Sequence, residues 1–227
     1  MVNISPLYDV PTEYSRGWNQ KLLETKLGDS VDINLIGDDA TRENFASAIN
    51  DTGRVIHFGH GSKNALIGQN NEPIIDLDKV MELKDKKVYT MSCLSAKNLG
   101  IEAYKSGCKE YWGAIEPIGF VPEEHELFGE IYNMGAYQRF YEKRPIKEVL
   151  KNMEDKFNEN IDKAEDPWTR VWLRADRDSW KCWSDETPPP REMTDCMFRG
   201  LAVKLFGCTG WKIPNLSMIW YKITHIF

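Results

Sequence analysis

Two residues in this sequence, His60 and Cys93, are of the types that nucleophilic catalysis requires. His60 lies between two glycines in the run Gly59-His60-Gly61-Ser62, directly after an apolar segment. Because glycines permit a sharp turn, this run is expected to push the imidazole out beyond the end of a strand. A polar turn with an incidental histidine is the plainer interpretation, and the motif alone leaves both open.

Cys93 follows a second apolar segment, Val88-Tyr-Thr-Met, and precedes a predicted helix. A thiol near a helix N-terminus feels the partial positive charge of the exposed N–H groups, which is expected to lower its pKa and enrich the nucleophilic thiolate. A small buried hydrophobic side chain is the alternative. The other cysteines lack this setting and are predicted to be structural; they are Cys108, Cys182, Cys196 and Cys208.

His57 differs from His60, because it falls inside the predicted strand between apolar neighbours. Successive side chains of a strand point to opposite faces, so His57 is placed on the face opposite Ile56 and Phe58. A core histidine with its hydrogen bonds satisfied is the expected role.

The segments around these residues alternate between strand and helix patterns. Strands are predicted at Val2–Ser5, Val31–Ile36, Arg54–Phe58, Lys87–Met91 and Glu110–Ile115, with a hairpin or loop over Ala65–Ile75. Helices are predicted over Glu13–Lys26, Thr41–Asn50, Leu77–Leu83 and Ala96–Lys105. Strands separated by helices predict a mostly parallel sheet with helices on both faces. Ligands in such sheets bind beyond the carboxyl ends of the strands, where His60 and Cys93 would meet as general acid/base and nucleophile.

After Pro122 the pattern becomes mainly helical. Helices are predicted over Glu123–Tyr141, Ile146–Ala164, Pro167–Trp180 and Met193–Phe206, with a linker from Ser184 to Arg191. This part holds most of the tryptophans, which favours packing against the sheet over a binding platform; they are Trp168, Trp172, Trp180, Trp183, Trp211 and Trp220. We therefore divide the chain into an α/β core, residues 1–125, and a mainly helical Trp-rich extension, residues 126–227, that packs on the core.

Composition narrows the class of protein. The 227 residues are 41% hydrophobic and 28% charged, with a formal net charge of −6, which argues against a nucleic-acid partner. The sequence shows neither a signal-peptide pattern nor an apolar run of about 18 residues, so no membrane contact is expected. The five cysteines form no CxxC, which suggests neither a disulfide framework nor a metal site and fits a cytoplasmic location. No GxGxxG or GxxxxGK[ST] loop supports a nucleotide cofactor.

The blocks around the two candidate residues resemble those of clan CD cysteine peptidases. In that group an apolar strand ends in His-Gly and a second one ends in a small residue plus Cys, as in Val55-Ile-His-Phe-Gly-His-Gly-Ser and Val88-Tyr-Thr-Met-Ser-Cys-Leu-Ser-Ala. The group includes caspases, gingipains, legumain, clostripain, separase and the CHAT proteins. Leu35-Ile-Gly-Asp-Asp-Ala-Thr and Ala103-Tyr-Lys-Ser-Gly-Cys also resemble segments of gingipain-like and CHAT proteins. The likeness covers residues 1–125 and implies a caspase-like three-layer αβα sandwich.

The resemblance implies a role for each matched residue. Cys93 would be the nucleophile and His60 the histidine that protonates the leaving amine, without a third catalytic side chain. The backbone N–H groups of Gly61 and Cys93 would form the oxyanion hole. The implied activity is that of a cysteine endopeptidase acting on a peptide or protein substrate, with no metal and no cofactor.

The resemblance also implies that a pocket near the cysteine selects the P1 residue, the residue before the scissile bond. Gingipain-like members hold Arg or Lys there with an acid that follows the first strand, and Asp9 takes a comparable place here. Glu116, after the last parallel strand, is a second candidate, and Ser92 is a third residue assigned to this pocket. A preference for basic P1 residues is therefore a hypothesis. A solvated loop charge is the alternative for each acid.

Two functions remain open at this point. One is an active cysteine endopeptidase, and the other is a catalytically silent caspase-like module that binds a partner through its Trp-rich part or its cleft. The segment between the two blocks is short and carries no evident activation site. Regulation is therefore left to a partner protein or effector.

Overall fold

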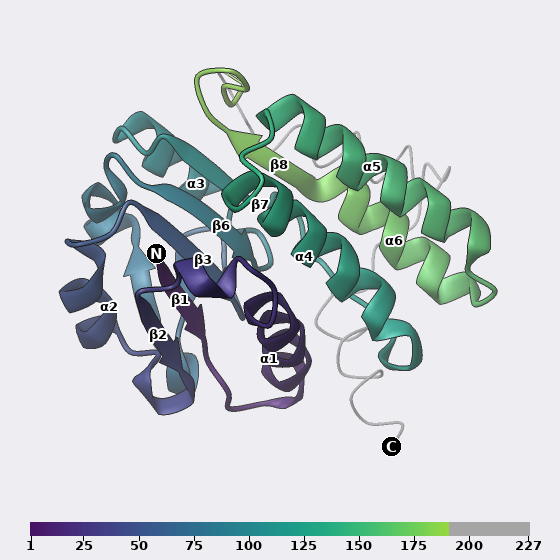
Figure 1. Cartoon of the computed structure of the whole chain (residues 1–227), viewed down its shortest axis with the longest axis horizontal. Coiled ribbons are helices and arrows are strands. Elements are labelled where there is room, and N and C mark those ends of the chain that lie inside the picture. Colours follow the sequence, from purple (N-terminus) through teal and green to yellow (C-terminus); the bar gives the residue numbers. More distant parts are fainter. Residues whose placement is uncertain (191–227) are drawn as a thin grey trace, which may run out of the picture. The chain divides into compact units, whose positions relative to one another are not determined.

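A six-stranded sheet lies at the centre of the computed structural model, which describes residues 1–190 (Figure 1). The strand order is β2-β1-β3-β6-β7-β8, and all neighbours are parallel except β7 and β8. The strands are β1 (Val2–Ser5), β2 (Ile33–Ile36), β3 (Arg54–Phe58), β6 (Lys87–Met91), β7 (Glu110–Ala114) and β8 (Trp180–Trp183). The five parallel strands predicted from the sequence are confirmed within two residues at their ends.

Helices cover the sheet on both faces, which gives the predicted αβα arrangement of three layers. The α-helices are α1 (Val10–Leu23), α2 (Arg42–Ile49), α3 (Asn98–Lys105), α4 (His125–Phe140), α5 (Ile146–Lys163) and α6 (Pro167–Ser179). Short 3-10 helices span Gly28–Ser30, Gly37–Asp39, Gln69–Asn71, Leu77–Leu83 and Pro122–Glu124. A separate hairpin, β4 (Ala65–Ile67) and β5 (Pro73–Asp76), follows β3, where the sequence predicted a hairpin or loop. None of the helices in this described part combines the length and apolar character that crossing a bilayer requires.

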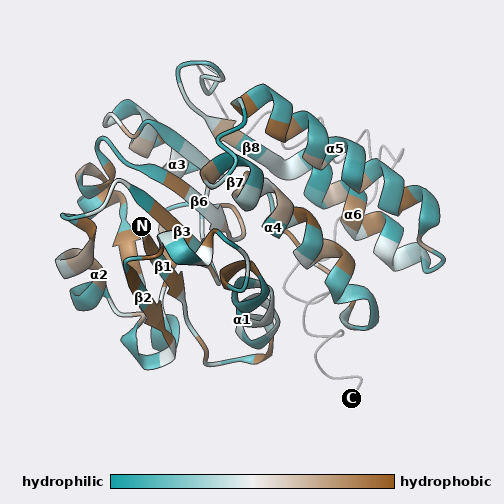
Figure 2. Cartoon of the chain, in the orientation of Figure 1, coloured by the Kyte–Doolittle hydropathy of each residue, from teal (hydrophilic) through white to brown (hydrophobic). Residues whose placement is uncertain are grey.

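A hydrophobic core lies between the sheet and the helices α1, α4, α5 and α6. Ile56 and Phe58 of β3 and Tyr89 of β6 join it from the sheet, together with Trp18 of α1 and Tyr132 of α4. Figure 2 shows the central strands largely hydrophobic and α5 striped with hydrophilic and hydrophobic residues. This is the pattern of a sheet buried on both faces and covered by an amphipathic helix.

The last strand, β8, is the main element that the sequence analysis did not predict. Trp180–Trp183 pairs antiparallel with β7 and closes the sheet, whereas the sequence pattern predicted only the end of a helix there. Trp180 and Trp183 are buried, as expected for packing against the sheet, but Trp168 is 65% exposed. Met193–Phe206, Trp211 and Trp220 lie outside the described residues.

The compact unit that contains the sheet extends from residue 1 to residue 189. Helices α4, α5 and α6 and strand β8 belong to it, because their apolar side chains join the same core cluster as the parallel strands. The structure thus places its boundary after residue 189, whereas the sequence analysis placed one after residue 125.

Candidate functional site

The carboxyl ends of β3 and β6 lie side by side, and the two candidate catalytic residues follow them. The strands are parallel neighbours, with Phe58 opposite Met91 at the last paired position. The N–H of Gly59 donates to the carbonyl oxygen of Met91 at 3.3 Å, which continues the ladder beyond the strands. His60 and Cys93 therefore leave the sheet at the same level of the same rim.

Gly61, the residue after His60, packs directly against the turn that carries Cys93. A Cβ placed on Gly61 would lie 2.7 Å from the Cβ of Ser92 and 2.9 Å from the carbonyl oxygen of Cys93. Glycine is needed here because the two loops approach so closely that no side chain fits between them. The loops of the two candidate residues are thus in contact, while the side chains of His60 and Cys93 are bonded to other groups.

The imidazole of His60 is held by Asp9. Its Nε2 lies 2.8 Å from Oδ2 of Asp9, and its side chain is 28% exposed. An ionised carboxylate only accepts hydrogen bonds, so Nε2 carries the proton and donates it to Asp9. In the neutral ring Nδ1 is then the basic nitrogen, which leaves His60 able to take a proton from a neighbouring group.

Asp9 links the start of α1 to His60. Its Oδ1 accepts hydrogen bonds from the N–H and the hydroxyl of Thr12, at 3.0 and 2.8 Å, as the N-cap of the helix. Partial burial acts to raise the pKa of Asp9, but the bonds from Thr12 and the nearby His60 outweigh it and lower that pKa. The sequence analysis assigned Asp9 to the P1 pocket, whereas here both carboxylate oxygens already have partners. Because β1 and β3 are neighbours in the sheet, residues following them share one rim, and strand order could have revealed this pair.

The thiol of Cys93 is hydrogen-bonded to a backbone carbonyl in this conformation. Cys93 is half-buried against the core cluster, and its thiol lies 3.5 Å from the carbonyl oxygen of Ile118, to which it donates. Burial raises its pKa to about 11, and the negative charge of Asp176 also acts to raise it. The expectation of a lowered pKa was wrong, because the turn after Cys93 delays the start of α3 until Asn98 and the covering protein removes solvent.

Next to Cys93 runs a segment formed by residues 115–121, which we call the covering segment. It is hydrogen-bonded to α6. The N–H of Glu116 donates to Oγ of Ser179 at 2.9 Å, and the N–H of Gly119 donates to Oδ1 of Asp176 at 3.1 Å. The ring of Trp172 lies where a side chain on Gly119 would be. Helix α6 thus holds the segment whose Ile118 carbonyl accepts the bond from the thiol.

Asp176 is a functional candidate that the sequence analysis missed. It is fully buried in α6, and its Oδ2 accepts a hydrogen bond from the hydroxyl of Tyr132 at 2.8 Å. Burial raises its pKa well above the usual range for an aspartate. Helical spacing could have revealed it, because Thr169, Leu173 and Asp176 share the buried face of α6.

The turn after Cys93 contains a strained residue. Leu94 has a φ of 60°, in the left-handed region that residues with a Cβ rarely adopt. Its N–H donates to the carbonyl oxygen of Glu116 at 3.2 Å, which holds the turn in place. Residues in such conformations cluster at active sites, where the surrounding structure maintains them.

The remaining predicted site residues occupy distinct environments. Glu116 is half-buried, and burial raises its pKa although the charge of Lys97 acts against that shift. Ser92 is buried, which leaves its side chain no exposed surface to meet a substrate, so its assignment to the P1 pocket does not fit this structure. Among residues 1–190, the N–H groups of Gly61 and Cys93 donate to no backbone carbonyl.

His57 is fully buried, and its ring has a partner at each nitrogen, as expected for a core histidine. Its Nδ1 lies 2.8 Å from Oγ of Ser92 and 3.1 Å from Oγ1 of Thr90, and its Nε2 lies 2.9 Å from the carbonyl oxygen of Ile67. Burial lowers its pKa to about 4.

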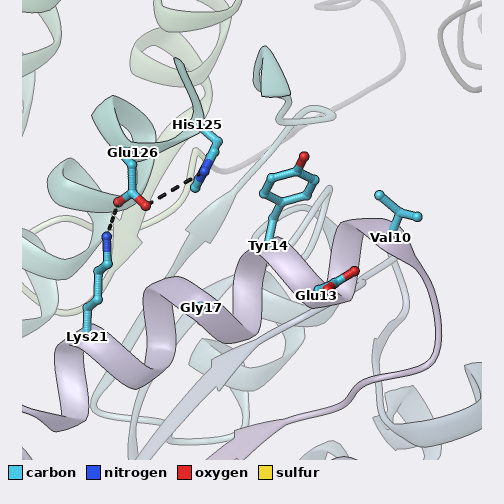
Figure 3. Close-up of a pocket in the computed structure, with 7 residues that line it drawn as sticks. All are labelled: Val10, Glu13, Tyr14, Gly17, Lys21, His125 and Glu126. Carbon is cyan, nitrogen blue, oxygen red and sulfur yellow. Dashed lines mark hydrogen bonds and ion pairs between the residues drawn. The ribbon is translucent and has the colours of Figure 1, made fainter. Parts of the chain in front are cut away.

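An open groove of about 270 Å³ lies along α1, next to the start of α4 (Figure 3). Its lining residues are Val10, Glu13, Tyr14, Gly17, Lys21, His125 and Glu126. The groove begins at Val10, the residue after Asp9, and ends at the ion pair between Lys21 and Glu126. Within residues 1–190 no cluster of three or more metal-ligating side chains occurs.

The sheet order, the helices on both faces and the rim location of the site define a caspase-like fold. A solved structure with a similar fold is the complex of the pro- and mature domains of RgpB from Porphyromonas gingivalis. The TM-score is 0.52 and the identity 12%, with 81% of this chain and 46% of that chain covered. This chain thus spans less than half of the RgpB chain, and at this identity the likeness concerns the fold alone. No family model and no curated protein matches the sequence.

Proposed function

We propose that this chain is a cysteine endopeptidase of the caspase-like type, with Cys93 as nucleophile and His60 as general acid/base. The observation that carries the proposal is the packing of Gly61 on Ser92 and Cys93, which joins the two loops at one rim. The fold likeness to RgpB and the sequence resemblance to clan CD peptidases both support it.

In the proposed reaction, the thiol of Cys93 passes its proton to Nδ1 of His60, and the sulfur attacks the carbonyl carbon of the scissile peptide bond. The N–H groups of Gly61 and Cys93 stabilise the negative oxygen of the tetrahedral intermediate. His60 then donates the proton to the leaving amine, which leaves a thioester on Cys93. Water hydrolyses this thioester, with His60 accepting a proton from the water and returning it to the thiol.

Asp9 adds a third member to the pair that the resemblance implied. By accepting the Nε2–H of His60, its carboxylate orients the ring and stabilises the imidazolium that forms during proton transfer. This role requires no movement of Asp9, because α1 already fixes its other oxygen through Thr12.

The reaction requires the thiol to leave the carbonyl of Ile118 and turn toward His60. Because burial raises its pKa to about 11, the thiol is protonated at neutral pH until it gives its proton to His60. Substrate binding beside the covering segment would supply this change, since α6 holds that segment by a few hydrogen bonds and one ring contact.

A basic P1 preference is part of the proposal, now carried by Glu116. Asp9 is engaged with His60, whereas the carbonyl of Glu116 accepts a hydrogen bond from the N–H of Leu94, in the turn after Cys93. Matched peptides with Arg, Lys, Ala or Asp at P1 test this preference. Glu116→Gln is expected to reduce the advantage of Arg and Lys, and equal cleavage of all four peptides would end the basic-P1 proposal.

A catalytically silent module that binds a partner is the second candidate function. The bond from Cys93 to Ile118 and the raised pKa of the thiol favour it, because both describe an inert cysteine. The two functions separate in a cleavage assay on a mixed peptide library. Wild-type cleavage that is lost in both Cys93→Ala and His60→Ala supports the peptidase, and cleavage that survives in Cys93→Ala contradicts it. Cys108→Ala serves as a control, because it removes a buried thiol from the connection between α3 and β7.

A further inference from the structure

His57 contacts the bases of both loops that carry the proposed catalytic pair. It lies on β3, fully buried, and precedes Gly59, the first of the glycines that flank His60. A Cβ on Gly59 would lie 3.3 Å from its Nε2. On its other side the ring reaches Ser92, the residue before Cys93, at 2.8 Å.

The partners of the His57 ring define its tautomer. The carbonyl of Ile67 can only accept, so Nε2 carries the hydrogen and donates it. Nδ1 is therefore an acceptor, and the hydroxyl of Ser92 donates to it. The hydroxyl of Thr90, 2.7 Å from that of Ser92, completes the chain of bonds. Because burial lowers the pKa of His57 to about 4, this neutral tautomer persists at every pH above that value.

Each of the two hydrogen bonds of the His57 ring leads to a residue that is bonded to a proposed catalytic residue. Ile67, which accepts from His57, also donates its N–H to the carbonyl of His60 at 3.1 Å. Ser92, which donates to His57, is joined to Cys93 by a peptide bond, and its carbonyl accepts a hydrogen bond from Ser95 at 3.1 Å. A single rigid ring thus connects the backbone of one loop to the backbone of the other.

An apolar side chain at this position would avoid the free-energy cost of burying a polar imidazole. Val55 and Val88, on the same buried face of the sheet, are such side chains. The imidazole adds two hydrogen bonds in opposite directions, which we call its two arms. It donates from one side to the carbonyl of Ile67 and accepts on the other side from the hydroxyl of Ser92.

We propose that His57 is a positioning residue, which fixes the loop of His60 and the turn of Cys93 relative to each other. This inference rests on the proposed peptidase function. A positioning error of about 1 Å between reacting groups can reduce turnover by about a hundredfold, so the spacing of the two loops is expected to appear in kcat rather than in KM.

Three substitutions separate the two arms. His57→Asn keeps an acceptor near Nδ1 and loses the donor to Ile67, whereas His57→Gln keeps a donor near Nε2 and loses the acceptor for Ser92. His57→Leu removes both arms. We expect kcat to fall about tenfold in the first two and about a hundredfold in His57→Leu, with KM changed less than about twofold. Ser92→Ala breaks one arm without altering His57 and is expected to match His57→Gln.

Thr52→Val is the control, because Thr52 is a buried, hydrogen-bonded residue near the opposite end of the same strand. The inference is overturned if His57→Leu, folded as judged by circular dichroism, keeps kcat within about threefold of wild type, or if Thr52→Val loses as much.

A wild-type protein that cleaves no peptide would refute the proposed function instead. The rate at which iodoacetamide alkylates Cys93 then tests His57 without catalysis. That rate is expected to change more than about threefold in His57→Leu and not in Thr52→Val, and equal rates in the two variants would refute the positioning role.

Discussion

The part of the candidate site that carries His60 and the part that carries Cys93 differ in how accessible and how well positioned their side chains are. The half that carries His60 is open and preorganised, because Asp9 holds the ring from a capped helix and leaves one nitrogen free. The half that carries Cys93 is covered, because its thiol donates to the carbonyl of Ile118 in the covering segment. This segment is hydrogen-bonded to α6. The proposed acid/base is thus held at the sheet rim, whereas the proposed nucleophile lies against a segment that is hydrogen-bonded to α6, an element far along the chain.

His57, the buried histidine that contacts both loops, gives the largest expected effect on the free energy of unfolding when the pH falls. The folded-state pKa of His57, about 4, lies below the ordinary 6.5, so the unfolded chain binds a proton first as the pH falls. Its contribution is therefore present above pH 6.5 and is lost toward pH 4, by about 3 kcal/mol at 1.36 kcal/mol per pKa unit. Urea unfolding of wild type and His57→Asn across this range measures it. An equally steep loss of the free energy of unfolding in the variant would contradict the assignment.

Asp9 offers a sharper test of the preorganised half. Asn caps helices as well as Asp does, so Asp9→Asn is expected to keep α1 and the thermal midpoint while kcat falls about ten- to a hundredfold. Asp9→Ala, the companion variant, should lose about 1 kcal/mol of stability in addition. Because the pKa of Asp9 is lowered, its carboxylate stays ionised at pH 5 and its contribution to kcat is lost only at lower pH. A kcat for Asp9→Asn equal to that of wild type would remove Asp9 from the mechanism.

The covered half is tested at Ser179, which accepts the hydrogen bond from Glu116. Ser179→Ala removes about 1 kcal/mol from the attachment of the covering segment, which corresponds to about a fivefold increase in its release. The alkylation rate of Cys93 by iodoacetamide should rise by up to that factor, while the buried Cys108 in the same sample stays unreactive. A rate that stays at the wild-type value would mean that α6 does not control access to the thiol.

The sequence predicts the surroundings of His60 better than those of Cys93. The strands that end before His60 and Cys93 follow from apolar runs separated by helices, and Gly61 follows from the close approach of the loops. β8 was missed because Trp-Lys-Cys-Trp directly continues a helical pattern, and only its pairing with β7 makes it a strand. The covered thiol results from a bond between Cys93 and Ile118, residues far apart in the chain, which periodicity and spacing do not report. The burial of Asp176, in contrast, follows the helical spacing of Thr169 and Leu173 in α6.

The smallest expected effect concerns the groove along α1, beside the open half of the site. Gly17 lies within this helix, and a Cβ there would meet no atom within 4 Å. Gly17→Ala should therefore stabilise the protein by up to about 1 kcal/mol, or about 2–4 °C in Tm, and leave kcat unchanged. Gly129→Ala in α4 is the opposite control, because its Cβ would collide with the ring of Trp18. A lower Tm for Gly17→Ala would show that the groove is already filled.

A peptidyl chloromethylketone with Arg at P1 tests whether Cys93 and His60 act as a pair. Mass spectrometry of the intact and digested protein identifies which thiol is alkylated and how fast. If they do, alkylation is selective for Cys93 and at least about tenfold slower in His60→Ala, with Cys108 and Cys182 unlabelled. Alkylation of Cys93 at the same rate in wild type and His60→Ala, or of all accessible thiols alike, would contradict this pairing.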